Sequence, residues 1–242
     1  MRPVRAVLLD VDDTLVDTRG AFTVAWRACC ARYLPHADVE AVVRTWRADA
    51  GGHYAAYAAG RLGYEEQRHL RVNALHAEHG GPQLDEAGFA AWNALFESAF
   101  RSGWRAFDDA GALLAELAER GVPVGMVTNA ASDYQRLKLR TAGLPAPEVL
   151  VGVDVLGVGK PDPRVFLEGA RRLGLEPGEA AYVGDELYVD ALGAQRAGLQ
   201  GVWLDRPGAR HRPVAQEELD AALASGVRRV EGLSGLAPLL LG

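Results

Sequence analysis

The sequence predicts an α/β fold built on a parallel sheet, with a helical region inserted after the first strand. From about Ala106 onward, short apolar segments alternate with helical patterns at close intervals, which is typical of βα units. The stretch before it, back to Asp17, contains no such strand, and its apolar residues recur at helical spacing. We therefore expect a core domain of residues 1–16 and 107–242 and an inserted helical domain of residues 17–106.

The individual elements of the core follow from local patterns. Val4–Leu9 is a short, partly β-branched apolar segment that ends at an acidic cluster, which predicts a buried strand. Leucines at helical spacing, followed by Gly121, predict a helix over Asp108–Arg120. The other expected elements are strands at Val122–Val127, Ala180–Val183 and Gly201–Leu204 and helices at Pro163–Leu173 and Val189–Ala197.

The inserted region is rich in aromatic side chains. Phe22, Trp26 and Cys30 recur at helical spacing, and a second such stripe begins at Trp92. The simplest interpretation of these stripes is that they form the core of a small helical domain.

Composition excludes several classes of protein. A chain of 242 residues with 49% hydrophobic and 24% charged residues is long and apolar enough for a globular core. A net charge of -6 and scattered arginines argue against a nucleic-acid partner, and no apolar stretch approaches the roughly 20 residues of a membrane span. Cys29 and Cys30 are adjacent and cannot form a normal disulfide, and Asp10 ends an N-terminal apolar run too short for a signal peptide. We expect a cytoplasmic protein.

Polar residues follow the predicted strands. Asp10 and Asp12 come directly after the first strand, Thr128 follows the second, Asp185 follows a later one, and Lys160 also lies just past an apolar segment. Ligands of an open parallel sheet bind at the carboxyl ends of its strands, so these residues are expected to converge there.

The chemistry of this set favours a phosphoryl group. Asp10, Asp185 and Asp190 offer the hard oxygen ligands that Mg²⁺ prefers, and the absence of His and Cys from the set disfavours zinc. A cation beside a lysine and a hydroxyl suits phosphoryl transfer, and a carboxylate can itself be the nucleophile.

Four motifs in order resemble those of the haloacid dehalogenase (HAD) superfamily, in the group with a helical cap after the first motif. They are "DVDDTL" at Asp10–Leu15, "MVTNA" around Thr128, "GKPDP" around Lys160, and "GDELYVD" with Asp185 and Asp190. The resemblance covers essentially the whole chain and implies a Rossmann-like parallel sheet core with an all-helical cap.

The resemblance also implies a Mg²⁺-dependent phosphatase that hydrolyses a small phosphomonoester through an aspartyl phosphate. Asp10 would be the nucleophile and a metal ligand. Asp12 would be the general acid and then the general base, and its backbone carbonyl would bind the metal. Thr128, with Asn129 nearby, would bind the phosphoryl oxygens, and Lys160 would neutralise charge.

The remaining assignments concern the metal and the leaving group. Asp185 would bind Mg²⁺, and Asp190 would either bind it or hold Lys160 in place. Arg19, early in the cap, would suit a second anionic group of a small phosphorylated metabolite. Asp13 stands where the commonest family form has Gly, and we expect it to have a turn or capping role. The sequence does not predict an oligomeric state.

Other functions stay open from the sequence alone. A phosphomutase differs mainly in how the cap shields the intermediate from water. A dehalogenase of the same superfamily needs neither an acid two residues after the nucleophile nor a metal, so Asp12 and Asp185 favour phosphoryl transfer. A non-enzymatic phospho-accepting module would be shorter and would lack the cap.

Overall fold

The computed structural model describes residues 4–210 and 212–241, which fall into two compact units. One unit combines the chain up to Val16 with the chain from Ala106 onward. The other is Asp17–Arg105.

The first unit is an α/β unit built on a six-stranded parallel sheet, in the order β3-β2-β1-β4-β5-β6. Its strands are β1 Ala6–Leu9, β2 Val124–Val127, β3 Val149–Val151, β4 Ala180–Gly184, β5 Gln200–Leu204 and β6 Arg228–Val230. The predicted α/β fold with a parallel sheet is confirmed. Because β1 lies between β2 and β4, the residues that follow these three strands are brought side by side.

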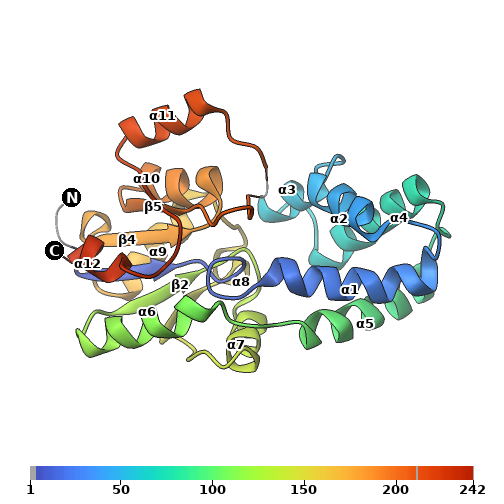
Figure 1. Cartoon of the computed structure of the whole chain (residues 1–242), viewed down its shortest axis with the longest axis horizontal. Helices are drawn as coiled ribbons and strands as arrows, with labels where there is room; N and C mark the ends of the chain where they lie inside the picture. The colour runs from blue at the N-terminus through green and yellow to red at the C-terminus, as the bar shows by residue number, and fades with distance from the viewer. Residues whose placement is uncertain (1–3, 211, 242) are drawn as a thin grey trace. The chain divides into compact units, whose positions relative to one another are not determined.

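Helices cover both faces of this sheet. Figure 1 shows α10 and α11 on one side of the strands and α6 on the other. The helices are α6 Asp108–Glu119, α7 Ser132–Thr141, α8 Val153–Leu156, α9 Pro163–Arg172, α10 Leu192–Arg196, α11 Gln216–Ala224 and α12 Leu236–Leu241. Pro163 opens α9, and the Asp162 side chain before it accepts a hydrogen bond from Arg164 N–H, which is a typical helix start.

The core of the α/β unit lies against the central strands. Leu8 of β1 is in register with Gly125 of β2 and Tyr182 of β4, and its side chain packs with Phe166 of α9 in one buried cluster. Gly169 lets α9 approach the sheet, because a Cβ there would lie only 3.0 Å from Leu8 Cδ1. These contacts fix the position of β1 along its neighbouring strands, and therefore the position of the acidic cluster that follows β1.

The structure differs from the sequence prediction at the edges of the sheet and near β4. Strands β3 and β6, at the two edges, were not predicted. The single helix expected over Val189–Ala197 is instead a π-helical turn, η2 (Leu187–Ala191), that continues into α10. The π turn places Asp190 beside the strand ends, as described below.

The second unit is a bundle of helices around aromatic rings. Its helices are α1 Thr18–Tyr33, α2 Val39–Ala48, α3 His53–Ala58, α4 Tyr64–His79 and α5 Glu86–Ser102. The Trp26 ring of α1 is fully buried, and its centroid lies 5.3 Å from Trp46, 5.4 Å from Trp92 and 5.3 Å from Phe96. The interpretation of the aromatic stripes as core packing is confirmed.

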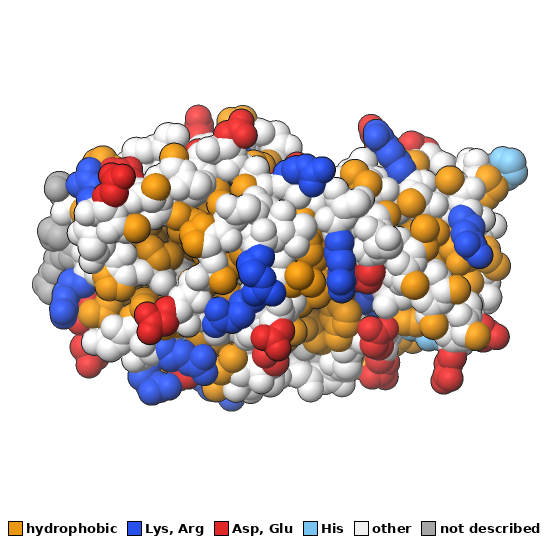
Figure 2. Space-filling model, turned by 90° about the horizontal axis from the view of Figure 1, so that it is seen from below, with side chains coloured by type: hydrophobic (Ala, Val, Ile, Leu, Met, Phe, Trp, Pro, Cys, Tyr) orange, Lys and Arg blue, Asp and Glu red, His pale blue; other side chains and the backbone are white. Residues whose placement is uncertain are grey.

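The surface and the cysteines agree with the compositional analysis. On the face shown in Figure 2, side chains of opposite charge are interspersed rather than gathered by sign. Cys29 and Cys30 are buried and free. Within the described residues, none of the helices combines the length and apolar character that crossing a bilayer requires.

Candidate active site

The predicted site residues of the core meet at the carboxyl ends of neighbouring strands. Asp10 follows β1, and its backbone N–H donates to Val183 O of β4 at 2.9 Å. Thr128 follows β2 and bonds to Val151 O of β3 in the same way, at 2.9 Å. Continued pairing past the strand ends therefore holds both residues at one edge of the sheet.

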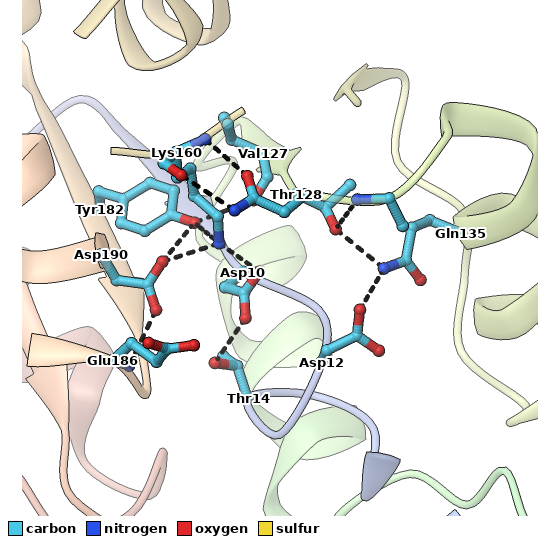
Figure 3. A network of polar contacts seen from close by, with 12 residues as sticks. Asp10, Asp12, Thr14, Val127, Thr128, Gln135, Lys160, Tyr182, Glu186 and Asp190 are labelled. Carbon is cyan, nitrogen blue, oxygen red and sulfur yellow. Dashed lines mark hydrogen bonds and ion pairs between the residues drawn. The ribbon is translucent and has the colours of Figure 1, made fainter. Parts of the chain in front are cut away.

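The Lys160 ammonium is the centre of a buried network. Its Nζ donates to Asp10 Oδ1 at 2.6 Å, to Asp190 Oδ1 at 2.7 Å and to Tyr182 Oη at 2.9 Å. Figure 3 shows these side chains converging on the lysine. The Lys160 side chain is only 4% exposed, so it meets these partners largely without water.

Asn129 holds the backbone of Lys160. Its Oδ1 accepts from Lys160 N–H at 2.6 Å, and its Nδ2 donates to Lys160 O at 3.0 Å. Gly159 makes room for this contact, because a Cβ there would lie 2.4 Å from Asn129 Oδ1. The side chain of Asn129 thus acts on the lysine, while the predicted contact between Asn129 and a phosphoryl group stays a prediction.

Burial sets the electrostatics of the Asp10–Lys160 pair. Burial raises the pKa of the Asp10 carboxyl well above its ordinary value, against the opposing charge of Lys160, and the nearby Asp190 and Asp185 raise it further. For Lys160, burial alone would lower the pKa, but Asp10 and Asp190 raise it well above its ordinary value. The site holds more carboxylates than one lysine neutralises, and an added cation would stabilise them.

The π-helical turn η2 brings Asp190 into this network. Asp190 Oδ2 accepts from Glu186 N–H at 2.9 Å, so the side chain folds back toward the end of β4. A Cβ on Gly184 would lie 2.4 Å from Asp190 Cγ, and glycine there permits the close approach. π turns are frequent at functional sites, because they redirect a side chain without ending the helix.

Three carboxylates form a candidate cation site. One oxygen from each of Asp10, Asp185 and Asp190 lies within 4.8 Å of the others. The backbone of Asp185 is anchored by Trp203 Nε1, which donates to its carbonyl at 2.8 Å. Three hard anionic oxygens, two of them on buried residues, fit a divalent cation such as Mg²⁺ and would lose their mutual repulsion on binding it.

Asp12 lies in a second network, away from Lys160. Gln135 Nε2 of α7 donates to Asp12 Oδ2 at 2.5 Å and to Thr128 Oγ1 at 2.9 Å. Lys138, one turn further along α7, forms an ion pair with Asp12 Oδ1. Figure 3 shows the Asp12 carboxylate turned toward Gln135. Asp10 and Asp12 are thus held by different partners.

The loop after Asp12 is a tight turn fastened to the rest of the unit. Asp13 adopts a left-handed backbone conformation, with φ at 57°, which confirms its predicted turn role. Thr14 Oγ1 lies 3.4 Å from Asp10 Oδ2, and Arg206 Nη2 donates to Thr14 O at 3.2 Å. Arg206 is itself held by both carboxylate oxygens of Asp109, at 2.9 and 2.7 Å. The nucleophile loop therefore has a fixed shape.

The structure brings seven predicted residues of the core into these networks, and Arg19 belongs to α1 of the helical unit. The seven are Asp10, Asp12, Thr128, Asn129, Lys160, Asp185 and Asp190. Sequence reasoning missed Gln135, Lys138 and Tyr182. Lys138 carried a usable signal, because lysine fills only two of the 26 Lys and Arg positions in the chain.

Comparisons with known proteins agree on a family. The family model described as haloacid dehalogenase-like hydrolase matches residues 4–198. The glyceraldehyde 3-phosphate phosphatase of Methanopyrus kandleri is 30% identical over 217 residues, 84% of each chain. The phosphoserine phosphatase of Thermus thermophilus is 41% identical over 141 residues, which cover 56% of this chain and only 57% of that enzyme.

Solved structures share the whole fold. YfnB of Bacillus subtilis, in a structure bound to magnesium, superposes with a TM-score of 0.78 at 24% identity and covers 99% of both chains. Crystal structures of dehalogenases also share the fold, at 21–22% identity. At these identities the likeness shows the fold alone.

Proposed function

Because this chain belongs to the haloacid dehalogenase-like hydrolases, we propose that it is a phosphatase that hydrolyses a small phosphomonoester in a Mg²⁺-dependent reaction, with Asp10 as the nucleophile. The observation that carries the proposal is the buried Lys160 ammonium bound to Asp10, at the edge of a cluster of three carboxylates. Two of the relatives are named as phosphatases of small phosphorylated metabolites, which supports the same class of substrate.

The cation would be held by the side chains of Asp10, Asp185 and Asp190 and by the backbone carbonyl of Asp12. When bound, it supplies positive charge that offsets the phosphoryl oxygens and the crowded carboxylates. Asp190 also bonds to Lys160 at 2.7 Å, so it supports the lysine whether or not it binds the cation directly.

In the first half of the reaction, an Asp10 carboxylate oxygen attacks phosphorus and the bond to the leaving oxygen breaks. Asp12 gives its proton to that oxygen, so an alcohol departs and an aspartyl phosphate remains. Lys160 offsets the charge on Asp10, and the Thr128 hydroxyl donates to a phosphoryl oxygen.

In the second half, the Asp12 carboxylate takes a proton from water as the water oxygen attacks phosphorus. The bond between phosphorus and the Asp10 oxygen breaks, which releases phosphate and restores the Asp10 carboxylate. Asp12 holds a proton again and is ready for the next leaving group. Each aspartate thus has a separate task, in keeping with its separate partners.

The other assignments from the sequence stay part of the proposal. Residues 17–106 would be the cap, and Arg19 would contact a second anionic group of the substrate. A cytoplasmic location is supported by two buried free thiols. A dehalogenase would have no use for the acid at Asp12 or for the carboxylate cluster, so phosphoryl transfer is favoured over it.

Phosphate release from a panel of small phosphomonoesters tests the proposal. The wild type should release phosphate with Mg²⁺ and lose this activity in a chelator, and Asp10→Asn should be inactive. Asp13→Asn is the matched control, because Asn also tolerates the left-handed conformation, and it should keep most of the activity. Retention of most activity by Asp10→Asn would contradict the assignment of the nucleophile, and release that a chelator leaves unchanged would contradict the metal requirement.

A further inference from the structure

Both carboxylate oxygens of Asp12 are bonded to side chains of one helix. Gln135 donates to Oδ2 and Lys138 pairs with Oδ1, and these two residues lie three positions apart, on the same face of α7. Gln135 is fully buried and Lys138 is 2% exposed, whereas the Asp12 side chain is 32% exposed. The carboxylate is therefore held from the interior, while the side chain stays partly exposed to solvent.

Stability alone gives little reason for a buried lysine at this place. A buried ion pair is often no more stabilising than apolar residues of the same volume, because both charges lose their hydration. The chain uses arginine for nearly all of its cations, and its two lysines are both buried, Lys160 on Asp10 and Lys138 on Asp12. A compact ammonium at each of these carboxylates points to a role in the reaction.

Gln135 links Asp12 to Thr128. The Thr128 hydroxyl oxygen accepts from Gln135 Nε2 at 2.9 Å and from the Ala130 N–H at 3.3 Å. These two donors occupy the lone pairs of the oxygen, and the described residues offer no acceptor for its proton. The hydroxyl is therefore oriented to donate to an incoming oxygen, and the amide that orients it also holds Asp12.

We propose that Gln135 and Lys138 are positioning residues that fix the direction of the Asp12 carboxylate for proton transfer at the leaving oxygen. Through the same side-chain amide, Gln135 also orients the Thr128 hydroxyl. The inference rests on the proposed function and deepens it. In this scheme neither residue contacts the phosphorus or the leaving oxygen. They act through Asp12, which gives up its proton as the bond to the leaving oxygen breaks and then accepts one from water.

The kinetic test compares leaving groups that differ in their need for a proton. Lys138→Met should lower kcat/KM, which reports the steps up to departure of the leaving group, by about tenfold or more for an alkyl ester such as glycerol phosphate. With p-nitrophenyl phosphate, whose leaving group departs without a proton, the loss of kcat/KM should be small. Lys138→Arg should recover part of the activity, and Arg140→Met, an exposed cation on the same helix, should match the wild type.

A double variant separates positioning from a general structural effect. In an Asp12→Asn background, Lys138→Met should cause no further loss of kcat/KM, because the carboxylate that it positions is already gone. A loss of kcat/KM that is equal for both esters, or that adds fully to the loss from Asp12→Asn, would overturn the role of Lys138. Phosphate release by the wild type in the same experiment would leave the proposed function standing.

An NMR spectrum tests the ion pair between Lys138 and Asp12 without relying on activity. The protein labelled with ¹³C-lysine should give signals from two lysines only. Asp12→Asn should shift the Lys138 signal, Asp10→Asn should shift the Lys160 signal, and Lys138→Arg assigns the peaks. A Lys138 signal that Asp12→Asn leaves in place would overturn the inference. Failure of the wild type to release phosphate would instead overturn the proposed function, and with it the role of the pair in the reaction.

Discussion

Replacing Lys160 by methionine should destabilise the protein, because the lysine offsets the repulsion between the Asp10 and Asp190 carboxylates. The change keeps most of the length of the side chain but removes the ammonium bound to Asp10, Asp190 and Tyr182. The two carboxylates, on residues 5% and 1% exposed, would then be buried without their counter-ion. Removing one partner of a buried ion pair typically costs about 3–5 kcal/mol, and for a chain of this length that corresponds to a fall in Tm of roughly 10 °C.

The fall should be largest when no divalent cation is present. A cation bound among the three carboxylates supplies the missing positive charge, so Mg²⁺ should raise the Tm of Lys160→Met more than that of the wild type. Thermal unfolding followed by circular dichroism, in EDTA and in Mg²⁺, measures both effects. Phosphate release by the variant should be lost under either condition.

An exposed ion pair supplies the control. Arg120 Nη2 lies 2.9 Å from Glu116 Oε1, but their side chains are 45% and 35% exposed. Arg120→Met should therefore cost less than about 1 kcal/mol. The reasoning is refuted if Lys160→Met has the same Tm as Arg120→Met in EDTA. It is also refuted if Mg²⁺ raises the Tm of Lys160→Met and of the wild type equally.

Three further predictions concern single groups. Burial alone would raise the pKa of Asp109, but Arg206 and the Leu233 N–H hold that pKa below its ordinary value, so the stabilisation is present above the unfolded pKa and is lost as pH falls. Asp109→Asn should thus lower the free energy of unfolding by about 1–3 kcal/mol at pH 7, measured by urea titration. The difference from the wild type should shrink below about pH 4, and an equal difference at both pH values would contradict this reasoning. Tyr182→Phe removes the buried hydroxyl that accepts from the lysine ammonium, and it should cost about 1–3 kcal/mol by the same titration, whereas an unchanged midpoint would count against the contact. Burial raises the pKa of Cys29 to about 12, so its thiol should resist iodoacetamide at pH 8 until urea unfolds the chain, and rapid labelling of the folded protein would disprove its burial.

The sequence was most informative where local chemistry is strong. Apolar runs that end at a polar residue or a glycine predicted β1, β2, β4 and β5 to within a few residues. The edge strands were missed for different reasons. Strand β3 has three residues, too short for a pattern, and β6 begins with Arg228 and Arg229, which give no apolar run. At the sheet edges, tertiary pairing rather than local pattern decides the conformation.

The site was predictable as far as its motifs extend. Asp10, Thr128 and Lys160 were found because motif order and strand ends both point to them. Helix α7 was hidden because it buries Gln135 and Lys138, so its inner face is polar and it lacks the apolar stripe by which a helix is recognised. Tyr182 looks like an ordinary apolar strand residue, and only the three-dimensional structure puts its hydroxyl beside a lysine 22 positions away.

The central place of β1 in the sheet has a consequence for synthesis and folding. Asp10 is synthesised well before its partner Lys160, which follows 150 positions later, and β4, which flanks β1, follows later still. Closing such long loops is slow. During translation β1 can therefore pair first with β2 and only later with β4, and a chain that stops before Lys160 lacks the assembled centre.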